Sequence, residues 1–418
     1  LLQYNFLRKG EIIKTTPFEM VLIIRDYMTV IGLVGPFGSG CSFIAKEILE
    51  KEFGYHYISL SDILREQYWK SENVEVGTPI QRSTMQDFGD AIREKNGSDY
   101  LSQMAVEKIN AFSSSGEDKF VIDSIRNPEE VYFLKKTYVD FFAFGIFAGN
   151  NLRWERIQST YSGNQAQFAA DEKRDKGGEK VAYGQRVTDA FLTSDAIILN
   201  EAPIVNKNEA YLKLKAKIEK YIGLFTGTAT DKSPTEVEAI MCMAYSNSLR
   251  SSCLKRKVGA VIVDSKGNVF SSGYNEVPFL EKPCLNMYGG CYRSVSKKKI
   301  EDLFNEKGTP GDLKGNVMAR VKLLEKCRAL HAEENAILNI ARFGSAAVLK
   351  DATLYTTTYP CNLCANKIAQ VGIRKVVYYE PYPVEEAKIT LEKAHVEQEM
   401  FEGITFNSYF RVFNEIIL

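Results

Sequence analysis

One histidine, one glutamate and two cysteines in the second half of the chain have the types and spacing of a metal centre. His331 and Glu333 stand two positions apart, and Cys361 and Cys364 follow Pro360 as a C-x-x-C pair. One imidazole and two thiolates hold Zn²⁺ while leaving its fourth position open to water. Zinc makes such a water acidic, and Glu333 is close enough to exchange protons with it without ligating the metal. The sequence therefore predicts zinc ligation by His331, Cys361 and Cys364, with Glu333 as the catalytic acid and base.

The surrounding pattern places these residues at helix ends. Residues 327–342 have the apolar spacing of one helix. A predicted strand over 352–357 ends in a loop, and Cys361 opens the next helix, where the helix dipole favours a thiolate. A structural Cys₂His site, or buried cysteines beside an unrelated histidine, is the alternative interpretation. The combined H-A-E and P-C-x-x-C spacing favours the catalytic centre.

The arrangement H-x-E…P-C-x-x-C is the signature of zinc nucleobase deaminases. Residues from about 234 to 400 also resemble the deoxycytidylate deaminase family, and the stretches that carry the resemblance are 253–263, 273–275, 331–337 and 353–355. The resemblance implies that Asn275 contacts the nucleotide and that Lys255 and Lys257 lie near its phosphate. It also implies that Ala332 and Tyr355 line the substrate site. The family usually has Gly after Asn275, whereas this chain has Glu276, an acid that would repel a nearby phosphate.

The chain contains eight Cys and three His, too few cysteines for a disulfide scaffold. Some members of the deaminase family carry a second, structural zinc near the active site. The resemblance implies such a closed site here, stabilising the insertion over 276–326. Ordinary buried cysteines are the alternative. The candidate ligands are Cys253, Cys284, Cys291 and Cys327.

A second motif lies in the first half. A strand-like run over 30–34 leads into G-P-F-G-S-G-C-S at 35–42, the Walker A frame with Cys41 where Lys belongs. The backbone N–H groups of this loop still suit a phosphate, but the cation that reaches the β- and γ-phosphates is absent. A working kinase, a nucleotide-binding regulatory module and a scaffold without ligand all stay open. The residues expected at a bound nucleotide are Gly35, Gly38, Ser39, Gly40, Cys41 and Ser42.

Other segments of the first half resemble nucleoside monophosphate kinases. Residues 59–65 resemble the monophosphate-binding segment of those enzymes, and 120–123 resembles a Walker B strand. Arg153 and Arg156 resemble the arginine pair near their lid, which the charged segment 171–180 would form. The resemblance covers residues from about 29 to 205.

The length of 418 residues predicts two or three domains. The Gly-, Thr- and Pro-containing stretch 223–234 is the best boundary, and it predicts domains over 1–228 and 229–418. Ser233, Pro234 and Glu236 predict the start of the next helix, as N-cap, first helical residue and capping-box partner. Strands and helices alternate in both halves. The predicted fold is α/β: an N-terminal P-loop kinase-like domain with a parallel sheet, and a C-terminal cytidine deaminase-like α/β/α domain. The expected strands are 29–34, 55–59, 120–122, 141–147 and 196–199, then 259–263, 269–274, 352–357 and 375–379.

The charge balance bears on the class of substrate. Lys plus Arg and Asp plus Glu both number 53, and neither half is strongly charged. A deaminase that edits polynucleotides needs a basic, aromatic groove, so this balance favours a small nucleotide. No apolar stretch approaches the roughly 20 residues of a membrane span. We therefore expect a cytoplasmic protein that does not enter a membrane.

The pairing of a degenerate P-loop half with a deoxycytidylate-type half resembles the bacterial antiphage dCTP deaminase family. The resemblance implies conversion of dCMP or dCTP to the uracil nucleotide, which would deplete the dCTP that phage replication needs. It further implies a homo-oligomer held inactive by a partner RNA. The alternatives are a polynucleotide cytosine deaminase, a dCMP deaminase of ordinary nucleotide metabolism and a non-catalytic nucleotide sensor.

Overall fold

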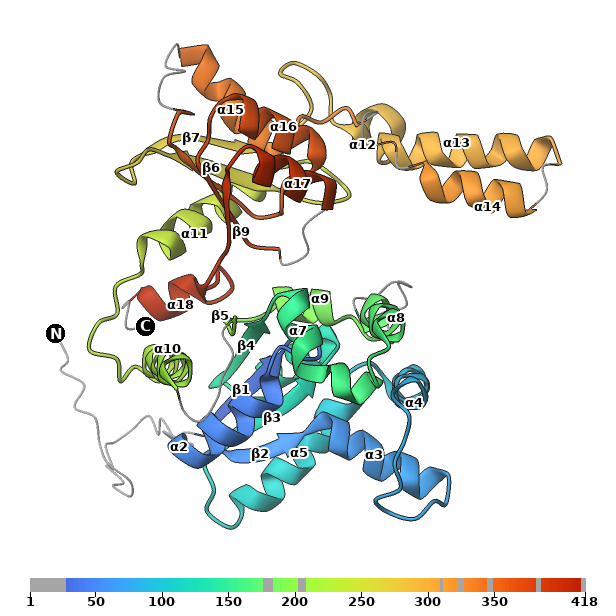
Figure 1. Cartoon of the computed structure of the whole chain (residues 1–418), viewed down its shortest axis with the longest axis vertical. Helices are drawn as coiled ribbons and strands as arrows, with labels where there is room; N and C mark the ends of the chain where they lie inside the picture. Colours follow the sequence, from blue (N-terminus) through green and yellow to red (C-terminus); the bar gives the residue numbers. More distant parts are fainter. Residues whose placement is uncertain are drawn as a thin grey trace, which may run out of the picture.

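The computed structural model describes residues 28–175, 183–201, 208–308, 311–321, 323, 327–343, 349–380 and 385–414. These residues form two α/β halves stacked one above the other (Figure 1). Each half has its own central sheet, so the α/β prediction for both halves is confirmed. Among the described residues, no helix combines the length and apolar character needed to cross a bilayer.

The first sheet is parallel over five strands, in the order β2-β3-β1-β4-β5. Its strands are apolar on both faces, as is typical of a parallel sheet covered by helices on each side. The strand β4, FFAFGIF, is buried at every position. The bounds are β1 (Thr29–Val34), β2 (His56–Ser59), β3 (Lys119–Ile125), β4 (Phe141–Phe147) and β5 (Ala196–Leu199).

Two cores lie on the two faces of this sheet. Val30 and Val34 of β1 pack into one core, whereas Ile31 and Leu33 pack into the other. The helices of this half are α1 (Cys41–Phe43), the π-helix η1 (Ile44–Glu50), α2 (Lys51–Phe53), α3 (Leu60–Ser71), α4 (Arg82–Asn96), α5 (Tyr100–Ser113), α6 (Pro128–Thr137), α7 (Asn150–Ile157), the 3-10 helix η2 (Gln158–Tyr161), α8 (Gln165–Asp175), α9 (Val187–Leu192) and α10 (Glu209–Phe225).

The second sheet has the order β10-β9-β8-β6-β7, in which β6 runs antiparallel to both of its neighbours. One face carries α15, α16 and α17, and α11 packs on the other. The strands are β6 (Gly259–Val263), β7 (Val269–Tyr274), β8 (Thr353–Thr356), β9 (Lys375–Tyr378) and β10 (Glu397–Met400). The helices are α11 (Glu236–Ser248), α12 (Cys284–Tyr288), α13 (Tyr292–Glu306), α14 (Gly311–Arg320), α15 (Ala332–Phe343), α16 (Asn362–Gln370), α17 (Glu385–Lys393) and α18 (Tyr409–Phe413).

The end of the chain returns to the first half. The strand β11 (Gly403–Ile404) pairs antiparallel with β5 and becomes the sixth strand of the first sheet. Glu402 accepts hydrogen bonds from the Leu199 backbone N–H and from Lys217, both in the first half. The expected division at 228 and 229 assigns this segment to the second half, whereas β11 completes the sheet of the first half. One hydrophobic core spans the junction, so the halves share buried surface.

Two helix starts differ from the predictions. The N-cap of α11 is Thr235 rather than Ser233, and its capping-box partner is Glu238 rather than Glu236. The predicted helix over 327–342 begins only at Ala332, because Leu330 pairs with Glu276 as an isolated β-bridge and holds the chain before it extended.

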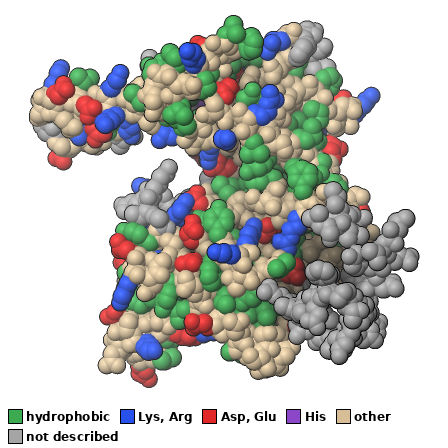
Figure 2. Space-filling model, turned by 180° about the vertical axis from the view of Figure 1, so that it is seen from behind, with side chains coloured by type: hydrophobic (Ala, Val, Ile, Leu, Met, Phe, Trp, Pro, Cys, Tyr) green, Lys and Arg blue, Asp and Glu red, His purple; other side chains and the backbone are tan. Residues whose placement is uncertain are grey.

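Helices α13 and α14 form an arm that projects from the second half (Figures 1 and 2). No residue of α13 is buried, and Lys/Arg and Asp/Glu side chains are interspersed along the arm. The arm lies within the predicted insertion over 276–326.

Candidate active site

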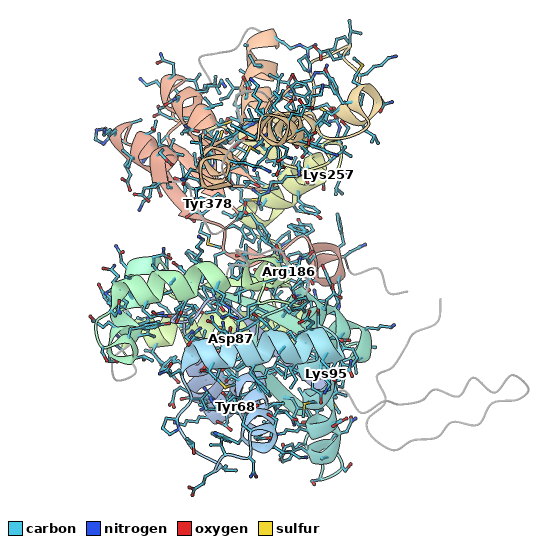
Figure 3. All side chains as sticks on the ribbon, turned by 90° about the vertical axis from the view of Figure 1, so that its right-hand side faces the viewer. Tyr68, Asp87, Lys95, Arg186, Lys257 and Tyr378 are labelled. Atoms are coloured by element: carbon cyan, nitrogen blue, oxygen red, sulfur yellow. The ribbon has the colours of Figure 1, made fainter. Side chains whose placement is uncertain are left out.

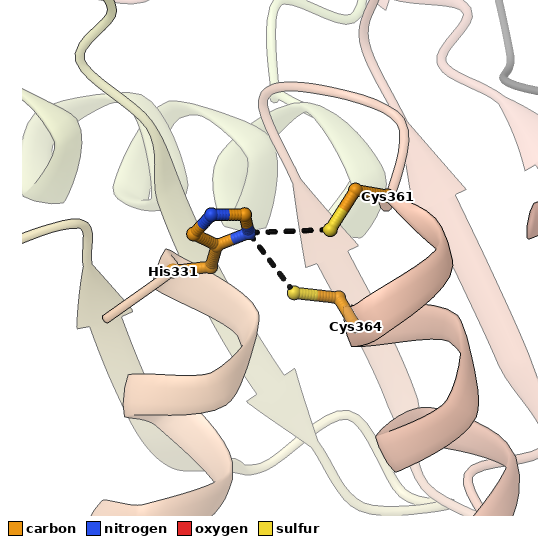
Figure 4. A group of neighbouring side chains, drawn as sticks. All are labelled: His331, Cys361 and Cys364. Atoms are coloured by element: carbon orange, nitrogen blue, oxygen red, sulfur yellow. Dashed lines mark hydrogen bonds between the residues drawn. The ribbon is translucent and has the colours of Figure 1, made fainter. Parts of the chain in front are cut away.

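His331, Cys361 and Cys364 converge on one point (Figure 4). The Nδ1 atom of His331 lies 3.3 Å from Sγ of Cys361 and 3.4 Å from Sγ of Cys364. Among the described residues, they are the only group of three or more His, Cys, Asp or Glu side chains with ligand atoms all within 4.8 Å of one another. Zn–S and Zn–N bonds in tetrahedral geometry place nitrogen and sulfur ~3.6 Å apart. The donor set and its spacing therefore fit zinc.

Two helix N-termini meet at this point. His331 directly precedes α15, Cys361 is the N-cap of α16, and Cys364 lies in the first turn of α16. A hydrogen bond from Cys364, together with the contact to His331, lowers the pKa of the Cys361 thiol to about 4. The same pairing and burial raise the pKa of Cys364. The pairing thus favours the thiolate form at Cys361.

Glu333 lies in the first turn of α15, and its side chain is buried. Burial raises the pKa of its carboxyl group above the usual range, and the nearby His331 opposes that shift. A carboxyl group with a raised pKa is suited to taking and returning a proton near neutral pH. The structure therefore places a proton-transfer group beside the three candidate ligands.

Close packing against β7 fixes the position of α15. A Cβ atom on Gly273 would lie 2.3 Å from the carbonyl oxygen of Ala332 and 2.4 Å from the nitrogen of Ala336, so only glycine allows this approach. Asn335 and Asn339 donate hydrogen bonds to carbonyl groups of β7, at 3.0 Å each. These contacts orient the helix turn that carries Glu333.

Three further contacts fix the loops around the site. Leu330, the residue before His331, exchanges two backbone hydrogen bonds with Glu276. Lys367 of α16 pairs with Glu334 of α15 at 3.1 Å. The hydroxyl group of Tyr359, two residues before Cys361, donates to Gln398 of β10. Tyr359 is not among the predicted site residues, although its place directly before P-C-x-x-C was a signal.

The side chains of Asn275 and Glu276 both form hydrogen bonds to neighbouring loop segments. The Asn275 side chain accepts a hydrogen bond from Val258 N–H at 2.7 Å and donates one to the Arg256 carbonyl group at 2.8 Å. It thereby orients the basic segment. The Glu276 carboxylate accepts bonds from the N–H and hydroxyl groups of Ser252, so it caps a loop.

The other predicted substrate-binding residues do not all lie on the metal-site face of the sheet. Lys255 and Lys257 are exposed on the segment that Asn275 orients. Ala332 is fully buried at the start of α15, in the core on the metal-site face of the sheet. Tyr355 points to the opposite face, into the core that contains residues of α11. The structure therefore does not bring Tyr355 to the metal site.

The four remaining candidate cysteines lie together, in one small cavity beside the start of the arm. Cys253, Cys284, Cys291 and Cys327 all line this cavity. No three of their sulfur atoms all lie within the 4.8 Å separation that the ligand atoms of His331, Cys361 and Cys364 meet. The structure thus gathers the four residues around one cavity but does not bring three of their thiols together as a ligand set.

The Gly-rich loop of the first half follows β1 at the centre of the parallel sheet. Gly40 has a positive φ of 100°, and a Cβ atom there would lie 2.3 Å from Asn200. Ser42 donates to Asp123 at 2.6 Å, and Asn200 donates to the Ser39 carbonyl group at 2.8 Å. Burial, with Asp123 nearby, raises the pKa of the Cys41 thiol to about 12. Cys41 is therefore uncharged where a Walker A lysine would carry a positive charge.

The comparisons with known proteins give one family model and several relatives. Residues 234–380 match the family model described as the cytidine and deoxycytidylate deaminase zinc-binding region. The chain is 38% identical over 144 residues to the deoxycytidylate deaminase of Saccharomyces cerevisiae, covering 34% of this chain and 37% of that protein. It is 35% identical over 157 residues to the deoxycytidylate deaminase of Enterobacteria phage T2, covering 35% of this chain and 81% of that enzyme.

The chain is also similar to a UPF0200 protein of Methanothermobacter thermautotrophicus, 26% identical over 195 residues, which covers 46% of this chain and 93% of that protein. The chain spans less than half of the length of the yeast deaminases that it matches, but most of the phage enzyme. The match over most of the phage enzyme, together with the zinc-binding region, shows that the chain belongs to the cytidine and deoxycytidylate deaminase family.

Proposed function

We propose that the protein hydrolytically deaminates deoxycytidine nucleotides at a zinc ion held by His331, Cys361 and Cys364. The observation that carries the proposal is the convergence of one imidazole nitrogen and two sulfur atoms beside the buried Glu333. Zinc, when bound, supplies the Lewis acidity that makes water a nucleophile near neutral pH. The names of the yeast and phage relatives support deoxycytidylate as the substrate.

In this proposal Glu333 moves the protons. Its carboxylate takes a proton from the attacking water and delivers it to N3 of the pyrimidine ring. It then takes the remaining proton of that oxygen and delivers it to the amine, which departs as ammonia when the C–N bond breaks. The raised pKa of its carboxyl group suits both directions of transfer. Asn275 acts through the segment 256–258 that it orients, and Lys255 and Lys257 supply positive charge for the phosphate.

We further propose roles for the two features outside the metal site. Cys253, Cys284, Cys291 and Cys327 bind a structural zinc, which their shared cavity supports. The Gly-rich loop and Ser42 bind nucleotide phosphate without transferring it, because Cys41 carries no charge. The first half then acts as a regulatory domain over 1–228, joined to the deaminase domain over 229–418 through the returning segment at β11.

The resemblance to antiphage dCTP deaminases supports a physiological proposal. We propose that the protein depletes dCTP during phage infection, that it assembles into a homo-oligomer and that a partner RNA holds it inactive. Ordinary dCMP deamination in nucleotide metabolism uses the same site and differs in its substrate and its regulation.

A nucleotide screen tests the function directly. The purified zinc protein is incubated separately with dCMP, dCTP, CMP, CTP and single-stranded DNA, and the products are separated by chromatography while zinc is measured on the same sample. We expect dUMP or dUTP to form, with no uracil in the DNA. Release of ammonia from none of these substrates would overturn the proposal.

A further inference from the structure

The insertion that carries the arm lies directly before a candidate metal ligand (Figure 1). Its chain leaves the second half at Glu276 and returns at Leu330, more than fifty positions later, and His331 follows at once. Bringing the ends of so long a loop together costs conformational entropy, which contacts at its base must offset. The position of His331 therefore depends on the contacts that hold residues 276–277 beside residues 328–330, which we call the neck of the arm.

Backbone hydrogen bonds close the neck. The Glu276 carbonyl group accepts a bond from Leu330 N–H at 2.9 Å, and Glu276 N–H donates to the Leu330 carbonyl group at 3.2 Å. The two residues form an isolated bridge rather than part of a longer strand ladder. A short pairing of this kind opens easily unless other contacts fix one of its two segments.

The Glu276 carboxylate fixes its segment to a neighbouring loop. One oxygen accepts bonds from the Ser252 hydroxyl group at 2.6 Å and from Val277 N–H at 2.9 Å, and the other accepts from Ser252 N–H at 2.9 Å. Three donors thus meet two acceptor oxygens. A carboxylate satisfies all three, whereas the amide group of Gln would turn a donor toward one of them. The buried Ser251 strengthens the attachment, because its hydroxyl group donates to the Asn275 carbonyl group at 2.5 Å.

The other side-chain contacts at the neck join different parts of the chain. Arg328 pairs with Glu281, and its guanidinium group lies 5.3 Å from the ring centre of Tyr288. Both partners belong to the insertion, so these contacts join the arm to its own returning segment. The Glu276 carboxylate instead joins the neck to Ser252, which lies outside the insertion.

We propose that Glu276 is a positioning residue for the reaction: its carboxylate closes the neck of the arm and thereby fixes the backbone that presents His331 to the metal. Leu330 directly precedes His331, so a displaced bridge displaces the imidazole group as well. Residues that orient a metal ligand contribute roughly 10–100-fold to metal affinity or activity. The role in the reaction rests on the proposed function, whereas the closing of the neck rests on the hydrogen bonds alone.

Hydrogen–deuterium exchange, read by mass spectrometry on the full-length zinc protein, tests the closing of the neck without an activity measurement. Glu301→Ala is the matched control, because Glu301 is an exposed acid of the same arm and its ion pair with Lys314, at 3.3 Å, lies within the arm. We expect exchange at the Leu330 amide to be roughly tenfold faster in Glu276→Ala, less so in Glu276→Gln and unchanged in Glu301→Ala. Circular dichroism and thermal melting check that each variant folds, and the Gln variant carries the test if the Ala variant does not fold.

The kinetics of dCMP deamination, measured with zinc in excess, separate three roles of the carboxylate. A positioning role lowers kcat roughly tenfold in Glu276→Ala and leaves KM within twofold. Lys255 and Lys257 follow Ser252 on the same loop of the second half, where Figure 3 labels Lys257. A carboxylate that served only these lysines would leave kcat unchanged and raise KM. A purely structural carboxylate would lower the melting temperature and leave both constants of the folded protein unchanged.

These outcomes decide the proposal. Wild-type exchange at Leu330 in folded Glu276→Ala and Glu276→Gln proteins would overturn the closing of the neck. Faster exchange with an unchanged kcat would overturn the positioning role, whether or not KM rises. A wild-type protein that does not deaminate dCMP would count against the proposed function instead, and the exchange measurement would still decide whether Glu276 fixes the chain before His331.

Discussion

Glu238 at the start of α11 offers a sharp test of how the two halves are joined. Its side chain is buried, and one carboxylate oxygen accepts a hydrogen bond from Ile404 N–H of β11 at 2.7 Å. The other accepts bonds from the N–H and hydroxyl groups of Thr235, at 2.7 and 2.8 Å. One carboxylate thus caps α11 and holds the strand that completes the first sheet.

The magnitude for Glu238→Ala follows from these bonds. Three hydrogen bonds to a charged group contribute roughly 1.5–3 kcal/mol each. Burying the carboxylate costs several kcal/mol of desolvation free energy. The alanine variant avoids this cost, which offsets part of the loss from the missing hydrogen bonds. We therefore expect the free energy of unfolding to fall by about 3 kcal/mol, and by less for Glu238→Gln, which retains the carbonyl oxygen.

Urea denaturation followed by circular dichroism measures this effect. Glu236→Ala is the control, because Glu236 lies in the same first turn of α11 but is exposed. Its substitution should change the free energy of unfolding by no more than roughly 0.5 kcal/mol. Equal stability of the Glu238→Ala and Glu236→Ala proteins would refute the assignment of Glu238 as the link between α11 and β11.

Three further predictions follow from the sites. Cys327→Ser should lower zinc content from two ions per chain to one, measured by metal analysis, while dCMP deamination persists; unchanged zinc content would contradict the structural site. Gly273→Val should yield little folded protein in expression and thermal-melting assays, because its Cβ atom would meet the backbone of α15 at 2.3 Å, and a normal melting temperature would contradict that packing. The pKa of Cys361 is lowered to about 4, so its thiolate is present above that pH and is lost as the pH falls through it. Metal-free protein at pH 6 should therefore react with iodoacetamide at Cys361 before the buried Cys242, whose pKa is raised by burial, and mass spectrometry identifies the modified residue.

Local patterns predict the strands well. The predicted strands 29–34, 141–147, 196–199, 259–263 and 269–274 have the observed bounds. The first four are short apolar or β-branched runs between turn residues, so their signal lies within the segment itself. The spacing of the metal-site residues is likewise local to two helix starts.

Features that depend on distant contacts were not predictable. The pairing of β11 with β5 joins residues about two hundred positions apart, and β11 has only two residues. The extended chain before His331 depends on Glu276, more than fifty positions earlier. The face that Tyr355 occupies depends on which side of the second sheet α11 covers, which the strand sequence alone does not specify.

The cavity beside the Gly-rich loop, which Arg82 and Arg93 line, shows the same limit. Arg82 and Arg93 stand on one face of a helix, but charged residues on a helix face are usually solvated. Only the packing of α4 beside Phe37 and Glu130 shows that this face is buried and lines a cavity.

Substitution of Glu333 by Gln tests the central claim most directly. The change removes the proton-transfer group and leaves His331, Cys361 and Cys364 in place. The turnover of dCMP, measured by ammonia release, should fall roughly 10²–10⁴-fold while the zinc content per chain stays that of the wild type. A Glu333→Gln protein that keeps its zinc and deaminates dCMP within tenfold of the wild-type rate would contradict the account.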